Sequence, residues 1–509
     1  MKIVSVAQMR ALEAAAFASG IREAALQEWA GHAVAEEVWR LLKSDERVAV
    51  MIGHGNNGRD GAVAAEWLLR HQIPVDLMLA PRHAITADEL SRLKALGASI
   101  VMGSWSTHLR SARVAIDAIA GIGVHGALRE PLAFMVPLLN LARAEPGSAL
   151  QVVSVDIPSG IDADTGAIPG EAVWADVTVT LGGVKQGLLR FPAAERVGRL
   201  IPREIGIPAT AAAGLPYNCL VEADLSRLVP ARPLDAHKYR FGRALVIAGS
   251  DHFPGAAALC STAAARSGAG LVTLAASRDV RLAVAAHTPE VTYTQQDVRP
   301  SDGPAVLAAV ESYLQSHNAV LLGPGLGRSA ETTAFVRAIL QARPAARQFV
   351  IDADALVALA EIADWPTLID QDVILTPHQG ELERLNGQPL SNDVPFWVHA
   401  GRLAQEWGCT LVAKGPCTCI ARPDGRVDVW PRPNSALATG GTGDVLAGIT
   451  AGLLAQRLRT WDAARLAVGL HGLAAERVVE RGCRTLLASD LLSEIPLALG
   501  ALARATRPR

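Results

Sequence analysis

Short apolar runs alternate along this chain with longer Ala- and Leu-rich segments of helical pattern. In the first part of the chain the apolar runs are residues 48–53, 74–80, 98–103, 114–119, 151–157 and 176–182. Strands that are apolar throughout are buried on both faces, and helical connections make successive strands parallel. The alternation therefore predicts a parallel sheet between two layers of helices, with two further helices before the first strand.

The alternation stops at a Pro- and Ala-rich segment, residues 208–236, and then starts again. The later strand candidates are residues 242–250, 270–276, 319–323, 348–354, 372–377 and 409–415. A chain of 509 residues is also too long for one ordinary core. We therefore expect two different α/β domains, residues 1–215 and residues 216–509.

Composition narrows the classes of function. Apolar residues make up 50% of the chain and charged residues 19%, which is typical of a well-packed soluble protein. The net charge of -2 offers no basic surface for nucleic acid. No apolar run is long enough to span a membrane, and the N-terminus lacks the continuous apolar core of a signal peptide. We expect a cytoplasmic protein with small-molecule partners and no nucleic-acid or membrane partner.

The stretch "GHGNNGRDG", residues 53–61, follows the first strand candidate. Its glycines spell G-x-G-x-x-G between a strand and a helix, which is the pattern of NAD-dependent oxidoreductases. That interpretation requires an acidic residue at the end of the second strand, but Asp76 lies inside that strand. An NAD-dependent dehydrogenase is therefore the weakest of the enzyme hypotheses.

Side chains in the same stretch suggest a different use. Asn56, Asn57 and Asp60 place amide and carboxylate groups where a pyrophosphate would need bare glycine backbone. Their oxygens suit a hard cation, with Asp117 and Ser159 as possible further oxygen ligands. The alternative is that Asn and Asp simply shape a tight turn.

Polar clusters follow four of the predicted strands in the first domain. They are residues 55–60, 117–126, 155–166 and 178–187. Ligands of open parallel sheets bind beyond the carboxyl ends of the strands, so we expect these clusters to meet in one site. Lys185, in the last cluster, is either a phosphate or acid–base group or a solvated lysine.

Together, four segments resemble the NAD(P)H-hydrate epimerase domain, also called the YjeF N-terminal domain. The segments are "GHGNNGRDGAVAA", "DAIAGIG", "VVSVDIPSGIDADTG" and "TVTLGGVKQGLL". The resemblance covers residues 3–207 and implies a Rossmann-like fold and a potassium ion held by Asn57, Asp117 and Ser159. It also implies contacts to the hydrated nucleotide from Asn56, Asn57, Gly58, Arg59, Asp60, Gly121, Ile122, Gly123, Val124, His125, Gly126, Ala127 and Asp156.

One residue departs from this family. Arg59 stands where the family usually has Gly, and it either binds a phosphate or points to solvent. Epimerisation at the hydrated carbon needs proton exchange or reversible ring opening, and hence a side chain of tuned pKa. Asp156 is our candidate for that catalytic role.

In the second domain the most informative stretch is "NSALATGGTGDVLAGITAGLLAQ", residues 434–456. Gly440, Gly441 and Gly443 predict a turn that presents backbone amides and the positive end of a helix dipole to an anion. Asp444 follows at the helix start, where it could act as a general base in phosphoryl transfer. The alternative is an ordinary helix cap with spare glycines.

Two smaller features of the second domain have ordinary interpretations. Alone, His378 in "TPHQGE" could be a strand-end histidine that a neighbour satisfies. Cys417 and Cys419 have no second Cys or His pair beside them, so reduced structural thiols are favoured over a zinc site.

The second domain resembles the NAD(P)H-hydrate dehydratase domain, which has a ribokinase-like fold. The matching segments are "HKYRFGRALVIAGS", "GPGLG", "DADAL", "TPHQGE", "KGPCT" and "NSALATGGTGDVLAGI", within residues 225–500. The resemblance implies adenine-nucleotide contacts from Lys414, Gly415, Pro416, Cys417, Thr418 and Gly443. It implies substrate contacts from Ala256, Gly325, His378 and Asp444.

The two resemblances imply one bifunctional enzyme, an isomerase and a lyase, that repairs hydrated nicotinamide nucleotides. The first domain would interconvert the R and S hydrates of NADH and NADPH. The second would dehydrate the S hydrate at the expense of ADP, with Mg²⁺ on the nucleotide and a phosphorylated intermediate. The family also suggests a homo-oligomer. The alternative is a ribokinase-type small-molecule kinase fused to a non-catalytic nucleotide-binding module.

Overall fold

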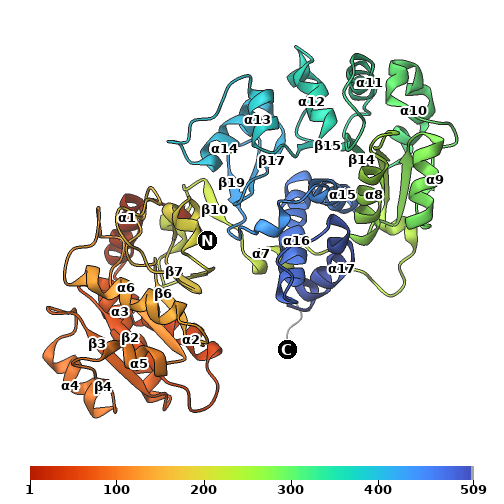
Figure 1. Cartoon of the computed structure of the whole chain (residues 1–509). Coiled ribbons are helices and arrows are strands. Elements are labelled where there is room, and N and C mark those ends of the chain that lie inside the picture. The colour runs from red at the N-terminus through yellow and green to blue at the C-terminus, as the bar shows by residue number, and fades with distance from the viewer. Residues whose placement is uncertain (506–509) are drawn as a thin grey trace. The chain divides into compact units, whose positions relative to one another are not determined.

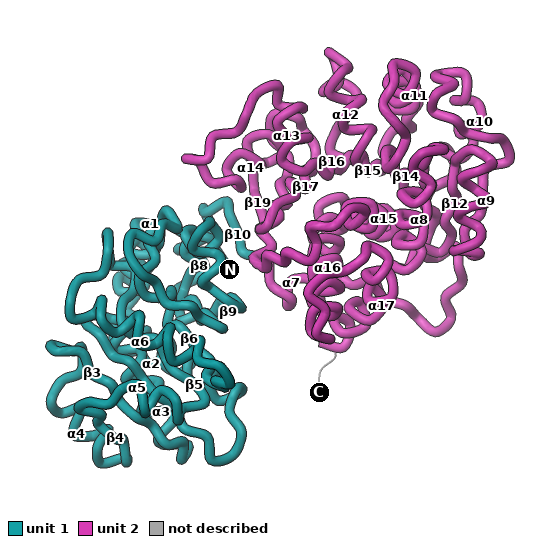
Figure 2. The backbone as a smooth tube through the Cα atoms, in the orientation of Figure 1, with its two compact units in different colours: residues 1–219 teal, residues 220–509 magenta. Residues whose placement is uncertain are grey.

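The computed structural model describes residues 1–505, which fold as two compact units. The first unit ends at Cys219 and the second begins at Leu220 (Figure 2). The change of unit falls inside the Pro- and Ala-rich segment, for which the sequence predicts a boundary after residue 215.

A seven-stranded sheet forms the centre of the first unit, and all its neighbouring strands pair in parallel. The strand order is β4-β3-β2-β5-β6-β7-β9. The strands are β2 Val48–Ile52, β3 Val75–Leu79, β4 Ser99–Ile100, β5 Val114–Ala118, β6 Gln151–Val155, β7 Val177–Leu181 and β9 Arg199–Arg203. A separate parallel pair joins β1 (Ile3–Val4) to β8 (Val184–Lys185), and β10 is Tyr217–Cys219.

Helices cover both faces of this sheet (Figure 1). They are α1 Val6–Ala18, α2 Glu23–Leu41, α3 Gly55–Arg70, α4 Ala87–Ala95, α5 Trp105–Ser111 and α6 Leu132–Ala144. Because side chains alternate along a strand, Val50 packs into a core with α2 and α3 while its neighbour Met51 packs with α5 and α6. The first unit is therefore a three-layer αβα domain, as the sequence predicts.

The second unit has a larger, mixed sheet. From β19 the strand order is β19-β18-β17-β16-β15-β14-β11-β12-β13. The strands are β11 Arg243–Ile247, β12 Leu271–Ala275, β13 Thr292–Tyr293, β14 Ala319–Leu322, β15 Gln348–Ile351, β16 Val373–Leu375, β17 Thr410–Ala413, β18 Cys419–Ala421 and β19 Val427–Val429. Pairing is parallel from β13 to β17, whereas β18 and β19 are antiparallel. The sequence does not predict this antiparallel edge, which a short hairpin after β17 produces.

Helices also form two layers in the second unit. They are α7 Glu222–Ser226, α8 Pro254–Arg266, α9 Arg278–His287, α10 Leu307–Ser316, α11 Ala330–Gln341, α12 Asp354–Ala360, α13 Gln379–Asn386, α14 Phe396–Trp407, α15 Thr442–Ala455, α16 Thr460–Glu480 and α17 Ala488–Ala505. Helices α8, α15, α16 and α17 share one apolar core with the sheet, and Figure 1 shows α11 to α13 on the other side. This arrangement confirms the predicted αβα class of the second domain.

In each sheet the chain reverses its direction of strand addition at one place. In the first unit the reversal lies between β2 and β5, and in the second between β11 and β14. The loops that follow such a pair of strands leave in opposite directions and open a crevice, which is the usual ligand site of this architecture. Among residues 1–505 no helix is long and apolar enough to cross a membrane.

Candidate active sites

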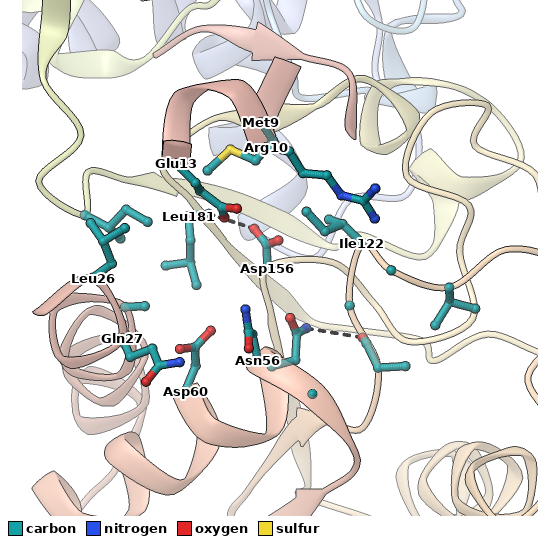
Figure 3. A pocket seen from close by; sticks show the side chains of 18 of the residues that line it. Met9, Arg10, Glu13, Leu26, Gln27, Asn56, Asp60, Ile122, Asp156 and Leu181 are labelled. Atoms are coloured by element: carbon teal, nitrogen blue, oxygen red, sulfur yellow. Dashed lines mark hydrogen bonds between the residues drawn. The ribbon is translucent and has the colours of Figure 1, made fainter. Parts of the chain in front are cut away.

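A cavity of about 640 Å³ opens at the carboxyl edge of the first sheet. Its walls come from α1 and α2, the first turn of α3, the loop after β5, and the ends of β6, β7 and β8 (Figure 3). The β2 and β5 ends that flank the reversal of the sheet both reach it. The polar clusters that the sequence places after four strands therefore meet in one cavity.

The "GNNGRD" segment is helical, which corrects its interpretation as a turn before a helix. Helix α3 begins at Gly55, so the segment is the first turn of that helix. A Cβ on Gly53 would lie 1.9 Å from the carbonyl oxygen of Ile119, and one on Gly58 would lie 2.6 Å from the carbonyl oxygen of Gly53. These two glycines allow β2, the loop after β5 and α3 to approach closely, a role that needs no pyrophosphate.

Asp76 has a structural role that excludes it from a cofactor site. It lies near the start of β3, away from the carboxyl edge, and is buried. Its carboxylate pairs with Arg47 at 2.7 Å and with His108 at 2.8 Å. The acidic residue that an NAD-dependent dehydrogenase would need is thus engaged elsewhere.

The three side chains expected to hold potassium lie together beside the loop after β5. The Asn57 amide nitrogen donates to the carbonyl oxygens of Val155, at 2.7 Å, and Ala120, at 3.2 Å. The Ser159 hydroxyl lies 3.1 Å from the same Ala120 oxygen and donates to Asp117 at 2.6 Å. A Cβ on Gly121 would lie 2.1 Å from the Asn57 side-chain oxygen, so this contact requires glycine.

Asp117 is a fully buried carboxylate without a basic partner among residues 1–505. It accepts hydrogen bonds only from neutral groups, which are the Ser154 and Ser159 hydroxyls and the amides of Ser159 and Ile119. Burial raises the pKa of the Asp117 carboxyl despite these hydrogen bonds. An adjacent cation would compensate this buried charge.

Asp156 and Lys185 form an ion pair in the wall of the cavity. The ammonium of Lys185 donates to Asp156 Oδ1 and, at 2.8 Å, to the carbonyl oxygen of Leu181. The Leu181 amide and the Thr180 hydroxyl donate to the same carboxylate oxygen, at 2.9 and 3.4 Å. All three of these donors bind Oδ1, so Oδ2 is available to a ligand. Asp156 has a φ of +67°, a conformation that few L-residues adopt and that recurs at functional sites.

Lys185 is only 1% exposed, so the alternative of a solvated strand-end lysine is wrong. The parallel pairing of β8 with β1 carries this residue into the interior beneath α1. The residues next to Lys185 in the sequence did not reveal that burial. The helix that covers it, α1, comes from the opposite end of the unit's sequence.

Two further carboxyls face the cavity with altered acidity. Burial, followed by the charge of Asp156, raises the pKa of Asp60 well above the usual range. Burial is also the largest cause of the raised pKa of Glu13, although the charge of Lys185 opposes it. The cavity thus combines one ion pair with two carboxyls whose pKa is raised.

Most of the sequence-predicted residues of the first site line the cavity, but some do not. The lining includes Asn56, Asn57, Asp60, Gly121, Ile122, Gly123, Val124 and Asp156. The predicted residues outside the lining are Gly58, Arg59, His125, Gly126 and Ala127. Arg59 is exposed on α3, so of its two predicted orientations the structure has the solvent-facing one.

The two leading helices contribute residues that the sequence did not point to. Arg10 and Glu13 of α1 and Gln27 of α2 line the cavity and point into it in Figure 3. The sequence could have indicated two of them, because Arg10 and Glu13 are the only charged residues of an otherwise apolar or neutral helix. Arg10 supplies a cation without a fixed partner in the described chain, which suits a phosphate.

The second site is built around the start of α15. Gly441 precedes the helix with a φ of +90°, and Asp444 lies in the first turn. A Cβ on Gly441 would lie 2.7 Å from the side chain of Leu259, so this position needs glycine for space as well as for conformation. Helix α15 begins two residues earlier than the sequence suggests. As at the start of any helix, amides of its first turn have no carbonyl partner within the helix and can bind an anion.

Asp444 has the acidity of a general base for neutral pH. Its pKa is raised from 3.8 to about 7, first by burial and then by the charge of Asp352. Lys414 opposes the shift. A carboxyl that titrates near neutral pH is a stronger base than an ordinary carboxylate and is still ionised in part.

Lys414, which follows β17, lies beside two acidic residues, one after β15 and one in α13. Its ammonium is 2.8 Å from Asp352 Oδ1 and 3.9 Å from Glu381 Oε2. Burial lowers the pKa of Lys414, but the charges of Asp352 and Glu381 outweigh it, so the pKa is raised and the cation is retained. Lys414 Nζ also lies 3.4 Å from the position of a Cβ on Gly443, which links the turn after β17 to the first turn of α15. Asp352 and Glu381 belong to segments that the sequence singled out, but it did not identify either residue.

The predicted substrate-binding residues Ala256, Gly325 and His378 lie in two places. A Cβ on Gly325 would lie 2.9 Å from the Cβ of Ala256, so these two residues are neighbours at the β11–β14 reversal. His378 accepts hydrogen bonds at Nδ1 from the amides of Gly380, at 3.1 Å, and Glu381, at 3.3 Å. It therefore caps α13, while its exposed ring carries its proton at Nε2.

The predicted nucleotide-binding residues Lys414, Gly415, Pro416, Cys417 and Thr418 form the turn between β17 and β18. The Thr418 hydroxyl closes this turn by donating to the carbonyl oxygen of Gly415 at 3.0 Å. Cys417 and Cys419 are both free thiols, and burial raises the pKa of Cys417 to about 12. Within residues 1–505 there is no cluster of three or more His, Cys, Asp or Glu side chains that could hold a metal ion.

Comparison with known proteins was consistent over the whole chain. The family model of the YjeF-related protein N-terminus matches residues 23–187, and that of the NAD(P)H-hydrate dehydratases matches residues 244–497. The chain is 35% identical to the bifunctional NAD(P)H-hydrate repair enzyme of Moorella thermoacetica, over 98% of this chain and 97% of that protein. This chain belongs to the family of bifunctional NAD(P)H-hydrate repair enzymes.

Another member of the NAD(P)H-hydrate repair family, from Thermofilum pendens, is 34% identical over 99% of this chain and 97% of its own length. Among solved structures, a ribokinase-like superfamily protein from Enterococcus faecalis matches 57% of this chain and 97% of its own with a TM-score of 0.51 and 27% identity. These matches confirm the predicted family and the ribokinase-like second domain. They favour a two-activity repair enzyme over a kinase fused to a binding module.

Proposed function

We infer that this chain interconverts the R and S hydrates of NADH and NADPH in its first unit and dehydrates the S hydrate in its second unit. The dehydration consumes ADP and yields AMP and phosphate. The observation that carries this inference is Asp444, a carboxyl that titrates near neutral pH beside the free amides of a helix start. That combination suits activation of a hydroxyl next to a phosphoryl group.

In the dehydration, Asp444 takes the proton of the substrate hydroxyl, and the oxygen attacks the β-phosphorus of ADP. AMP leaves, and the hydroxyl becomes a phosphate ester, which is a better leaving group than hydroxide. Phosphate then departs, and loss of a proton from the neighbouring ring carbon restores the nicotinamide double bond. The amides of Gly441 and Gly443, with that of Thr442 between them, would stabilise the transferring phosphoryl group, whose charge they face.

Residues around Asp444 would position the two substrates. Lys414, fixed by Asp352 and Glu381, supplies a cation for the nucleotide phosphates, with Gly415, Pro416, Cys417 and Thr418 beside it in the same turn. Ala256, Gly325 and His378 would contact the hydrated nucleotide. We propose these roles from the shared carboxyl edge of the sheet, on which all of these residues lie.

Mg²⁺ would travel with the nucleotide. Since the described residues have no three-ligand acidic or histidine cluster, its coordination would come mainly from phosphate oxygens, as Mg²⁺ commonly prefers. When bound, the ion neutralises phosphate charge. Nothing in the roles of Asp444 and Lys414 depends on a further protein ligand.

In the epimerisation, Asp156 would exchange the proton of the substrate hydroxyl through its free oxygen, Oδ2. Three donors hold the other oxygen, so the carboxylate is oriented before substrate arrives. Asn56, Asp60 and the loop from Gly121 to Val124 would contact the nucleotide, because they line the same cavity.

A potassium ion fits beside this cavity. The buried and uncompensated Asp117 carboxylate, the Ser159 hydroxyl and the Asn57 side chain lie around the carbonyl oxygens of Ala120 and Val155. The oxygens gathered here suit a weakly hydrated monovalent cation, which would take the place of the Asn57 amide nitrogen beside the two carbonyl oxygens. When bound, the ion would stabilise the loop after β5 and offset the charge of Asp117.

The direct test incubates the full-length protein with a mixture of R and S hydrates of NADH, ADP and Mg²⁺. We expect the near-ultraviolet absorbance of reduced nicotinamide to return and AMP to accumulate in equal amount. Chiral chromatography without ADP should show R hydrate converting to S hydrate. No recovery of absorbance would refute the dehydratase activity, and an unchanged R-to-S ratio would refute the epimerase activity. A homo-oligomeric state and a cytoplasmic location stay predictions from the sequence.

A further inference from the structure

Asp60 is a buried carboxyl that the chain leaves without a partner. Its side chain is 7% exposed, and no hydrogen bond or ion pair reaches the carboxyl from any residue within 1–505. It lies in the first turn of α3, lines the cavity and points into it (Figure 3). An unpaired buried polar group is costly, so a carboxyl in this position calls for a functional reason.

The charged groups around Asp60 favour its protonated form. Asp156 faces it from the end of β6 and Glu13 from α1, and both are acidic; Lys185 from β8 and Arg59 on α3 act in the opposite direction. Burial and the Asp156 charge outweigh the two cations, so the pKa of Asp60 is raised. Asp156, in contrast, accepts hydrogen bonds from an ammonium, an amide and a hydroxyl, whereas the Asp60 carboxyl accepts none within residues 1–505.

We propose that Asp60 and Asp156 act as an acid–base pair that opens and recloses the ring of the hydrated nicotinamide. Asp60 serves as the proton donor and Asp156 as the proton acceptor. Two carboxyls of unlike environment in one cavity are a common arrangement for such a division of labour. This proposal rests on the epimerase activity inferred above and assigns its missing acid.

The hydrated carbon carries a hydroxyl and the ring nitrogen, so the substrate is a hemiaminal. Asp156 Oδ2 takes the hydroxyl proton, the C–O bond becomes a C=O bond, and the C–N bond breaks. The nitrogen keeps the electron pair of that bond and receives the proton of Asp60, which gives an open-chain aldehyde and an amine. No oxidant or other reactant is needed.

Reclosure reverses each step on the other face of the aldehyde. After rotation about the adjacent C–C bond, the nitrogen electron pair attacks the carbonyl carbon and the N–H proton returns to Asp60. The new alkoxide takes back the proton held by Asp156. Both carboxyls regain their starting protonation states, and the configuration of the carbon is inverted.

The decisive variant is Asp60→Asn, which keeps the size of the side chain and cannot donate a transferable proton. In the full-length protein we expect kcat for R-to-S conversion, corrected for the uncatalysed rate, to fall on the order of 100-fold or more with little change in KM. Asp60→Glu should recover part of the rate. ADP-dependent dehydration of purified S hydrate by the same preparation should be unchanged, which checks that the variant is folded.

A matched control is Asp88→Asn, which removes an exposed carboxyl from the first turn of α4. It should epimerise like the wild type. If Asp60→Asn does so too, the role of Asp60 is refuted while the proposed function stands. If the wild type itself shows no epimerisation, the proposed function fails first.

Oxygen labelling tests the ring-opening route. In H₂¹⁸O, hydrate that has changed configuration should keep its original oxygen, because the hydroxyl oxygen becomes the aldehyde oxygen and returns. Uptake of one ¹⁸O per inversion would mean that water leaves and adds again, and would overturn the proposed route. Glu13→Gln gives a second check, since a loss as large as that of Asp60→Asn, with Asp60→Asn active, would transfer the donor role to Glu13.

The pH dependence adds a readout that a structural role would not move. Because Asp60 must be protonated, the wild-type rate should fall as pH rises through its raised pKa. The residual rate of Asp60→Asn should lack this alkaline fall. An identical alkaline fall in the variant would contradict the assignment.

Discussion

At the scale of single residues, both candidate sites contain carboxyls whose acidity their surroundings change. Asp444 has a pKa of about 7, and the pKa of Asp60 is raised well above its ordinary range. In both cases burial is the largest cause and another carboxylate the second. A residue type visible in the sequence thus acquires its function from charges that other segments bring near it.

Asp444 predicts a pH dependence of the dehydratase. The general base must be ionised, so kcat should fall as pH decreases below about 7. Asp444→Asn should lower kcat about 10²- to 10⁴-fold and abolish this acidic fall. Steady-state rates with S hydrate and ADP between pH 5.5 and 8.5, an interval set around the pKa of about 7, measure both effects. An acidic fall that persists in the variant would identify a different base.

Asp444 also predicts a pH dependence of stability, which should decrease as pH rises, whereas kcat should increase. Its pKa is higher in the folded than in the unfolded protein, so the stabilisation by its bound proton is complete below 3.8 and is lost as pH rises to about 7. At pH values above 7, Asp444→Asn should therefore raise the free energy of unfolding, by on the order of 1–2 kcal/mol. Urea denaturation of the variant and wild type at acidic and alkaline pH would show whether the difference appears only at the higher pH.

The buried pair of Asp156 and Lys185 predicts strong coupling. Lys185→Met would leave the Asp156 carboxylate buried beside the cavity without its cation, and should cost about 3–5 kcal/mol of stability. The double variant Asp156→Asn/Lys185→Met should recover much of this loss, because no uncompensated charge remains. Additive losses in the double-variant cycle, measured by urea denaturation, would show that the two groups are not coupled.

At the scale of secondary-structure elements, helix starts and strand ends position the reacting groups. His471 on α16 donates from Nε2 to the carbonyl oxygen of Thr442, the first residue of α15, at 2.9 Å. Burial lowers the pKa of His471 to about 4, so the ring is neutral and holds this bond across the physiological pH range. This contact fixes the turn that carries Asp444.

Loss of the His471 contact should therefore affect catalysis through α15. His471→Leu should lower kcat of dehydration on the order of 10- to 100-fold, because the donors at the start of the helix lose their alignment. Epimerisation should be unaffected. His317→Leu is the matched control, since His317 is also buried with a pKa of about 4 but bonds to Thr273 and Tyr313. Equal losses of kcat in both variants would indicate a general effect on the second unit.

At the scale of the whole molecule, two units with separate cores carry two separable activities. Each unit has its own sheet and its own reversal of strand order. The inferred product of the first unit, S hydrate, is the substrate of the second. Variants in one unit should therefore change which part of a substrate mixture is repaired and leave the other reaction intact.

The double variant Asp156→Asn/Lys185→Met tests this separation. With a mixture of R and S hydrates and excess ADP, it should regenerate reduced nicotinamide only until the S hydrate is consumed. The remaining R hydrate should then react at the slow uncatalysed rate, whereas the wild type should repair the whole mixture. Absorbance traces, with chiral analysis of the hydrate that remains, distinguish partial from complete repair. Complete repair by the variant would exclude Asp156 from epimerisation.

Local patterns in the sequence predicted a large part of the fold. Near-continuous apolar runs between helical segments can only be buried as parallel strands between helices, so both αβα sheets were predictable. Glycines and acidic residues after the strands marked the carboxyl edges where the sites lie, because that edge is where such sheets bind ligands. The first turn of α3 was missed, since Asn, Gly and Asp are poor helix formers in isolation. The hairpin of β18 and β19 was missed as well.

By itself, the sequence determined the two-domain α/β architecture, the family and the strand ends that form the sites. Tertiary structure alone decided which side chains meet there. In the first unit Glu13 and Arg10 face the cavity, Lys185 is buried against Asp156, and Arg59 points to solvent. In the second unit Asp352 and Glu381 hold Lys414. The physical reason is range. Strand and helix patterns are local properties of the chain, whereas burial and the electrostatic field at a carboxyl depend on groups that only folding brings together.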